Sequence, residues 1–342
     1  MRRILLIVVL VVTLGIIAIA WIFLGPGTGF SSSKETLYIS SKAANREAVL
    51  DSLRKHKIIR SETAFNFLAG QLKYWNNVRP GKYEITRGTS LLTIARRLRN
   101  NSQTPVQFVI IKFRTKEDFA RVTANKLEFD STDMINFLNN TDSMAKFDAT
   151  PETAMWNVLP DSYTYFWNTT PRKVYQKMYD ASKKFWTEER KKKAQAHGLF
   201  PVQAYILSSI VEEETNNNEE KDTIASVYLN RMNKGMPLGA DPTIKFALKD
   251  FGIKWIHGEM LNVQSPYNTY KTRGLPPGPI CTPSRKTIDA VLNAPATNYM
   301  FFVANSNFNG THLFSASFKE HEVKAKAYQE EDKRRREEKE VK

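Results

Sequence analysis

An uncharged apolar stretch at residues 4–24 limits what the start of this chain can fold into. A helix needs roughly 20 apolar residues to cross a bilayer core, and a backbone inside lipid must satisfy its own hydrogen bonds. Arg2 and Arg3 precede the stretch, and no further Lys or Arg occurs until Lys34. Because positive charge marks the cytoplasmic side, we expect residues 1–24 to be a single-pass anchor in the cell (inner) membrane. The N-terminus is then cytoplasmic and the remaining chain lies on the extracytoplasmic, or periplasmic, side.

A cleaved signal peptide is the alternative interpretation of this stretch. The segment Ala18-Ile19-Ala20 resembles the small-x-small pattern of a cleavage site. The apolar run nevertheless continues through Leu24 and is longer than the apolar core of a usual signal peptide. Its length therefore favours a retained anchor.

The formal net charge of +15 predicts an anionic partner: a nucleic acid, a membrane surface or an acidic polymer. The expected topology places the basic body outside the cytoplasm, which excludes nucleic acid and leaves the outer membrane leaflet and the cell-wall polymer. Cys281 is the single cysteine, so no intrachain disulfide can form, and the five histidines are scattered. We therefore expect no metal site and no cofactor.

Composition and periodicity divide the rest of the chain and predict the α+β fold class. Gly and Ser in residues 25–35 predict a flexible linker. Strand and helix patterns alternate in residues 36–105, with Ser61 as a helix N-cap, and predict a small α+β module for binding or positioning. Residues 106–328 predict a larger mixed α+β domain. Residues 329–342 are almost wholly charged and predict a tail that is either a solvated helix or disordered.

Three successive acids end an apolar segment at residues 207–215, and the Asn residues at 216–218 predict a helix stop. The residues that share one face at helical spacing are Leu207, Ile210, Val211 and Glu214. Glu212 and Glu213 point away from that face, so we expect them to be solvated. Glu214 is the acid directed toward the core.

Burial and the two neighbouring acids raise the pKa of a carboxyl group in the position of Glu214. A carboxylic acid that is still protonated near neutral pH can donate its proton to a leaving group. The structural alternative is that Glu214 pairs with an Arg or Lys and only ties two helices together. Helical geometry alone leaves both interpretations open.

Around this stretch the chain resembles the YceG-like endolytic murein transglycosylases, a family of lytic transglycosylases. The matching motifs occur in the family's order over residues 155–328. They are Ser209–Thr215, Ala225–Arg231, Asp241–Thr243, Tyr267–Tyr270, Gly274–Ile280 and Gly310–Ser315. Residues 36–105 resemble the family's small LysM-like domain more loosely. The Glu-Gly pair that often precedes the family's Pro-Asp-Thr-Tyr motif is absent from residues 155–163, which receive no role beyond a groove wall.

The resemblance implies a membrane-anchored enzyme that cleaves nascent peptidoglycan strands internally, between N-acetylmuramic acid and N-acetylglucosamine. Such an enzyme leaves 1,6-anhydro-N-acetylmuramic acid ends and terminates strand elongation. The family's catalytic glutamate precedes a threonine, as Glu214 precedes Thr215 here. Glu214 then protonates the glycosidic oxygen and afterwards takes the proton of the muramic C6 hydroxyl as it closes on C1. We expect Thr215, Asn268 and Tyr270 to orient the sugars, and wall-synthesis proteins such as penicillin-binding proteins to be partners.

Two other hypotheses compete with this one. A lysozyme-like muramidase needs a second carboxylate, for which Asp241 and Asp161 are the candidates. A non-catalytic, membrane-anchored protein that binds the wall as a scaffold needs no acid at all. Anhydro ends among the products separate the first hypothesis from the muramidase, and the effect of Glu214→Gln separates an enzyme from a scaffold.

Overall fold

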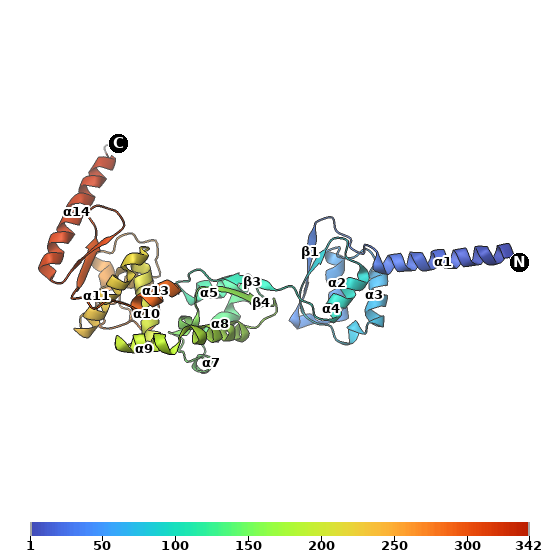
Figure 1. The fold of residues 1–342 in the computed structure, drawn as a ribbon, viewed down its shortest axis with the longest axis horizontal. Helices are drawn as coiled ribbons and strands as arrows, with labels where there is room; N and C mark the ends of the chain where they lie inside the picture. Colours follow the sequence, from blue (N-terminus) through green and yellow to red (C-terminus); the bar gives the residue numbers. More distant parts are fainter. Residues whose placement is uncertain (1, 341–342) are drawn as a thin grey trace. The chain divides into compact units, whose positions relative to one another are not determined.

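The computed structural model describes residues 2–340 and divides into two compact units, which we describe separately (Figure 1). The first unit comprises Met1–Phe108, Thr123–Asp130 and Tyr163–Thr170. The second unit comprises Val109–Val122, Ser131–Ser162 and Pro171–Lys342. Both units combine helices with short two-stranded sheets, which confirms the expected α+β class.

The first unit begins with α1 (Arg2–Leu24), an apolar helix in which no residue is buried by the protein. Among residues 2–340 it is the only helix long and apolar enough to cross a membrane. Its exposed apolar side chains have no protein partner to cover them, which fits a segment whose solvent is lipid. Phe23 at its end stacks on Phe67, with ring centroids 5.9 Å apart.

A small sheet and three helices share the core of the first unit. Strand β1 (Lys34–Ile39) pairs antiparallel with β2 (Gly81–Thr86). The helices are α2 (Arg46–Lys55), α3 (Glu62–Gln71) and α4 (Leu91–Arg99). Ser61 caps α3 as expected, because its side chain accepts a hydrogen bond from the backbone N–H of Ala64 at 3.2 Å. A second sheet consists of β3 (Val106–Val109) and β4 (Ser162–Tyr165).

The prediction of a flexible linker after α1 is wrong for its first residues. The backbone N–H of Gly27 donates to the carbonyl of Thr89 at 3.1 Å, and that of Gly29 donates to Ile58 at 3.2 Å. Thr28 is buried between these two bonds. Gly27 permits the close approach, because a Cβ there would lie 2.7 Å from the backbone nitrogen of Leu91. The glycines in this segment therefore dock the chain onto the first unit.

The second unit is mostly helical, with one sheet near its end. Its helices are α5 (Lys116–Ala124), α6 (Ser131–Asn139), α7 (Thr141–Ala145), α8 (Pro171–Phe185), α9 (Glu188–Ala196), α10 (Pro201–Glu214), α11 (Lys221–Asn233), α12 (Asp241–Leu248), α13 (Arg285–Leu292) and α14 (Phe318–Glu340). Strands β5 (Phe301–Ala304) and β6 (His312–Ser315) pair antiparallel.

Helix α10 lies at the centre of the second unit, where it packs against α11, α12 and α13 (Figure 1). Every residue from Ala204 to Val211 is buried, so the helix is covered on all sides there and not on one face alone. Ser208 tolerates this burial because its hydroxyl donates to the carbonyl of Ala204 at 2.6 Å. The hydroxyl of Ser209 accepts from the backbone N–H of Ile280 at 3.0 Å. A rigid, enclosed helix therefore carries the three acids at its C-terminal end.

The charged C-terminal segment is helical, as one of the two alternatives predicted, and it continues α14 to Glu340. It is packed in part and not simply solvated. The guanidinium of Arg335 lies 4.3 Å from the ring centroid of Phe308, and that of Arg336 lies 4.9 Å from the Trp255 ring. Both contacts are cation–π arrangements.

Candidate active site

Glu214 is the last residue of α10, and Thr215 ends the helix in an extended conformation. The carboxyl group is partly buried, and its Oε1 accepts a hydrogen bond from the hydroxyl of Tyr228 in α11. Tyr228 itself is buried, and burial raises its pKa well above the usual value. The phenol therefore remains a neutral donor directed at the acid.

Burial, and to a smaller extent the negative charge of Asp241, raise the pKa of Glu214, while Tyr228 and two nearby cations lower it, and the net result is a pKa of about 7. Within residues 2–340, no Lys, Arg or His forms an ion pair with Glu214. The structural alternative, an ion pair between helices, is therefore not the arrangement observed. An acid with a pKa near neutrality exists in both protonation states, so it can donate a proton and later accept one.

The prediction that Glu212 and Glu213 are solvated is wrong. Glu212 lies against the buried ammonium of Lys221 at 3.0 Å and accepts a hydrogen bond from Thr287 of α13. Glu213 forms ion pairs with Lys112 at 2.9 Å and with Arg114 at 2.8 Å. Burial acts to raise the pKa of Glu213, but the two cations outweigh it and lower the pKa. Both acids are structural ion-pair partners.

Arg231 of α11, the last residue of the motif Ala225–Arg231, organises the wall beside Glu214. Its Nε donates to the carbonyl of Met300 at 2.7 Å, and its Nη1 donates to Leu238 at 2.6 Å. Arg231 thus joins α11 to β5 and to the turn before α12. The sequence signal was present, because Tyr228 and Arg231 both belong to one motif at helical spacing, but their roles depend on contacts between helices.

The loop after α12 carries two of the expected sugar-binding residues, and they differ. Tyr270 is 37% exposed, and its hydroxyl donates to Asp241 at 2.5 Å. Asn268 has no exposed surface, and its Nδ2 donates to the carbonyls of Leu261 and Val263, both at 2.9 Å. The expectation that Asn268 contacts sugar is therefore corrected: the amide fixes the shape of the loop that presents Tyr270.

A cleft of about 390 Å³ opens beside Glu214. It is lined by Glu214, Thr215, Asn216, Asn217, Ala304, Asn305, Phe308, Gly310, Thr311, His312 and Tyr328. Thr215 is mostly buried, and its hydroxyl accepts from the backbone N–H of Asn217 at 3.0 Å. His312 is held by Glu220, whose carboxylate lies 3.0 Å from its Nδ1. The lining of the cleft thus includes the acid, a histidine and the aromatic rings of Phe308 and Tyr328.

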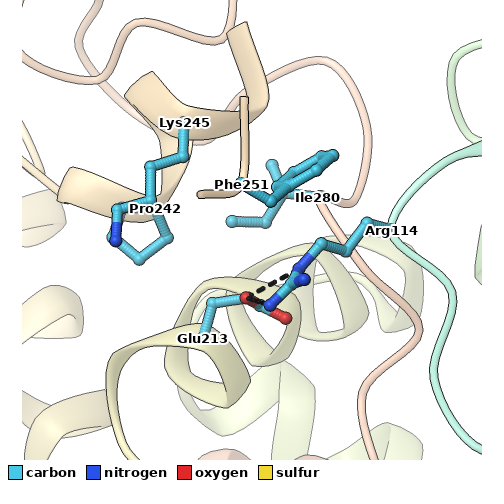
Figure 2. A pocket seen from close by; sticks show the side chains of 6 residues that line it. All are labelled: Arg114, Glu213, Pro242, Lys245, Phe251 and Ile280. Carbon is cyan, nitrogen blue, oxygen red and sulfur yellow. Dashed lines mark hydrogen bonds and ion pairs between the residues drawn. The ribbon is translucent and has the colours of Figure 1, made fainter. Parts of the chain in front are cut away.

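A second, smaller pocket of about 150 Å³ lies on the Glu213 side of the helix end (Figure 2). In Figure 2 Arg114 reaches toward Glu213, and Phe251 and Ile280 lie beside the pair. Pro242 and Lys245 of α12 line the same pocket. The charges of Asp241 and Lys245, both in α12, also affect the pKa of Glu214.

The two candidates for a second carboxylate have different surroundings. Asp241 is near enough to Glu214 to raise its pKa and is held by Tyr270. Asp161 forms an ion pair with Arg285 and is not among the groups that shift Glu214. Within residues 2–340, no three His, Cys, Asp or Glu side chains gather in a way that could hold a metal ion.

Comparison with known proteins identifies relatives over most of the chain. A model of the YceG-like family matches residues 38–327. An endolytic murein transglycosylase of Bacillus subtilis is similar at 26% identity over 317 residues, which cover 86% of each chain. One of Streptococcus pneumoniae is 36% identical over 103 residues, 29% of this chain and 19% of that protein. A crystal structure of a YceG-like protein from Listeria monocytogenes has a TM-score of 0.56 and 25% sequence identity, covering 86% of this chain and 99% of the other.

Proposed function

Because this chain belongs to the YceG-like family, we propose that it is an endolytic murein transglycosylase, a lyase that cleaves the glycan strands of peptidoglycan. The observation that carries the proposal is Glu214, a single acid in a cleft with a pKa of about 7. Its relatives are named for the same activity. The product ends are 1,6-anhydro-N-acetylmuramic acid.

The chemistry needs one group that gives and then takes a proton. Protonated Glu214 donates its proton to the oxygen between N-acetylmuramic acid and N-acetylglucosamine while the C1–O bond breaks. The resulting carboxylate takes the proton of the C6 hydroxyl, whose oxygen then bonds to C1. The substrate's own N-acetyl group offsets the positive charge that builds at C1. The nucleophile belongs to the substrate, so the reaction consumes no water.

Tyr228 and Tyr270 have supporting roles in this proposal. Tyr228 orients the carboxyl group and keeps its pKa from rising further. Tyr270, fixed by Asp241 and partly exposed, provides an aromatic face for a sugar ring. Thr215 shapes the helix end next to the acid. Asp241 is the nearest alternative for a second carboxylate, which keeps a muramidase as the competing reaction.

The membrane arrangement and the partners belong to the same proposal. Helix α1 supports a single-pass anchor, and the Arg2 and Arg3 pair supports a cytoplasmic N-terminus in the inner membrane, with the catalytic unit outside. Residues 36–105 then act as a LysM-like module that positions glycan. Penicillin-binding proteins are the partners that the family resemblance suggests.

Product analysis tests the reaction. Purified wild-type protein and Glu214→Gln are incubated with glycan strands, and the new ends are identified by mass spectrometry. We expect anhydro ends from the wild type and none from the variant, which should still bind strands. Reducing ends in place of anhydro ends would establish a hydrolase, and unchanged activity of Glu214→Gln would exclude Glu214 as the catalytic acid.

A further inference from the structure

The small pocket beside Glu213 contains more positive than negative charge. Arg114 and Glu213 line the pocket as an ion pair, and Lys112 beside the lining pairs with Glu213 as well, so this group carries an excess of one positive charge. Lys245 adds a second, and within residues 2–340 its ammonium makes no hydrogen bond or ion pair in the structure. An unpaired cation in a pocket with an excess of positive charge favours the binding of an anionic ligand.

The size of the pocket selects a small group. Its volume of about 150 Å³ corresponds to about five water molecules at roughly 30 Å³ each. A carboxylate on a short carbon chain fits such a space, and a disaccharide does not. Phe251 and Ile280 form an apolar wall against which the carbon chain of the ligand can pack. The pocket therefore suits the end of an acidic side chain.

The pocket lies beside the candidate catalytic acid, Glu214, which is not one of its lining residues. Glu213 lines the pocket and Glu214, the next residue, lines the larger cleft, so both hollows lie at the C-terminal end of α10. A sugar bound at Glu214 therefore lies next to the pocket that Lys245 lines. On muramic acid the substituent at C3 is the lactyl group, which carries the peptide stem.

A neighbouring pocket of about 270 Å³ continues beyond Arg114, which lines both hollows. It contains cations and acids together: Lys116, Lys249, Glu117 and Glu152. Tyr267 and Phe246 supply an aromatic wall, with ring centroids 4.6 Å apart. A groove that begins with an excess of positive charge and continues with both signs fits a charged peptide better than a single lactyl carboxylate.

We propose that the pocket formed by Lys245, Arg114 and Phe251 binds a carboxylate of the peptide stem on the muramic acid next to the scissile bond. The inference rests on the proposed function, because it takes peptidoglycan as the substrate. Lys245 is the counter-ion, and Arg114, held by Glu213, shapes the far side. Recognition of the stem makes peptide-bearing strands better substrates than strands whose stem carboxylates are neutral.

The test compares three substrates: strands with intact stems, strands whose stem carboxylates are amidated, and strands freed of stems by an amidase. The proteins are the full-length wild type, Lys245→Gln, Lys245→Arg and the control Lys254→Gln, which removes an exposed lysine from a nearby loop. We expect the wild type to prefer acidic over amidated stems by about tenfold in kcat/KM, as one hydrogen bond to a charged group allows. Lys245→Gln should abolish that ratio, while Lys245→Arg and Lys254→Gln should largely retain it.

Two results would overturn the inference. One is equal use of acidic and amidated stems by the wild type. The other is a Lys245→Gln variant that loses the same factor on all three substrates, because Lys245 would then act only through the pKa of Glu214. Binding of the same strands to Glu214→Gln, with and without Lys245→Gln, measures the pocket without catalysis. The chemical nature of the product ends therefore tests the proposed reaction. The ratio of binding to acidic and amidated strands tests the proposed role of the pocket.

Discussion

Tyr228 lowers the pH at which Glu214 loses its proton, and Tyr228→Phe tests this role. The phenol donates its hydrogen bond to Oε1 of Glu214 and so stabilises the carboxylate relative to the acid. Phenylalanine keeps the buried ring and removes only the donor. The pKa of Glu214 should therefore rise above its wild-type value of about 7.

The size of the shift follows from the strength of the bond. A hydrogen bond to a charged group contributes about 1.5–3 kcal/mol, and one pKa unit corresponds to about 1.4 kcal/mol. Losing the bond should raise the pKa of Glu214 by about one to two units. Because the reaction begins with protonated Glu214, activity falls as pH rises through this pKa. The alkaline limb of the wild type should lie near pH 7, and that of Tyr228→Phe should lie about one to two pH units higher.

The assay is kcat/KM for release of anhydro ends, measured from pH 5 to about 10, because this parameter reports the pKa values of the free enzyme. Tyr205→Phe is the matched control. It removes another buried hydroxyl, which donates to the carbonyl of Val158 at 2.7 Å and is not among the groups that shift the pKa of Glu214. The alkaline limb of the Tyr205→Phe pH profile should stay at the same pH as that of the wild type. An alkaline limb of Tyr228→Phe at the same pH or lower, in a folded protein, would refute the assignment of Glu214 as the general acid held by Tyr228.

Three further predictions concern stability. Glu214 binds its proton more tightly when folded, so its ionisation destabilises the protein as pH rises from the unfolded pKa of about 4.5 to about 7. Glu214→Gln should therefore be more stable than the wild type by about 3 kcal/mol at pH 8, with little gain at pH 5, in thermal or urea unfolding. Lys221→Met leaves the partly buried carboxylate of Glu212 without its ion-pair partner and should lower the free energy of unfolding by about 3 kcal/mol. Adding Glu212→Leu in the double variant should restore most of this loss. Gly278→Ala should lower the melting temperature by several degrees, since its Cβ would lie 2.1 Å from the carbonyl oxygen of Glu152.

Each of these predictions has an outcome that contradicts it. A stabilisation by Glu214→Gln that is equal at pH 5 and pH 8 would show that ionisation is not its cause. Additive losses in the Lys221 and Glu212 double variant would show that the two residues do not interact. Gly70→Ala is the control for the glycine, because a Cβ at Gly70 in α3 meets nothing within 4 Å. A loss of stability there equal to that of Gly278→Ala would exclude the steric explanation.

Features set by neighbouring residues could be predicted from the sequence. The apolar content of residues 4–24 indicated α1, and Ser61 indicated the start of α3, because both signals act within a few residues. The segment after α1 contains glycines that normally indicate flexibility, yet Gly27 and Gly29 dock on the first unit. The same property, a missing Cβ, permits both outcomes, and only the packing partner decides between them.

The loop after α12 shows the same limit at the candidate site. Asn268 and Tyr270 are two residues apart in one motif, and sequence gives both the polar character of a sugar-binding residue. In the structure Asn268 uses its amide to hold the carbonyls of Leu261 and Val263, because a buried backbone carbonyl needs a donor. Tyr270 is left to face outward. The need of buried loop carbonyls for a donor gives Asn268 a structural role and leaves the sugar-binding role to Tyr270. The motif itself does not reveal this need.

The three acids at the end of α10 show why position on a helix was sufficient to select one of them but not to describe the other two. Each step of 100° turns the next carboxyl group toward different neighbours: Glu212 toward Thr287 and Lys221, Glu213 toward Lys112 and Arg114, and Glu214 toward Tyr228. The first two meet cations, which favour the ionised form. Glu214 meets the neutral phenol of Tyr228 in a partly buried position, so its pKa is the one that rises. Within residues 2–340 the catalytic candidate is thus distinguished by the absence of an ion pair, and placing a lysine or arginine in contact with Glu214 should make it a third structural acid.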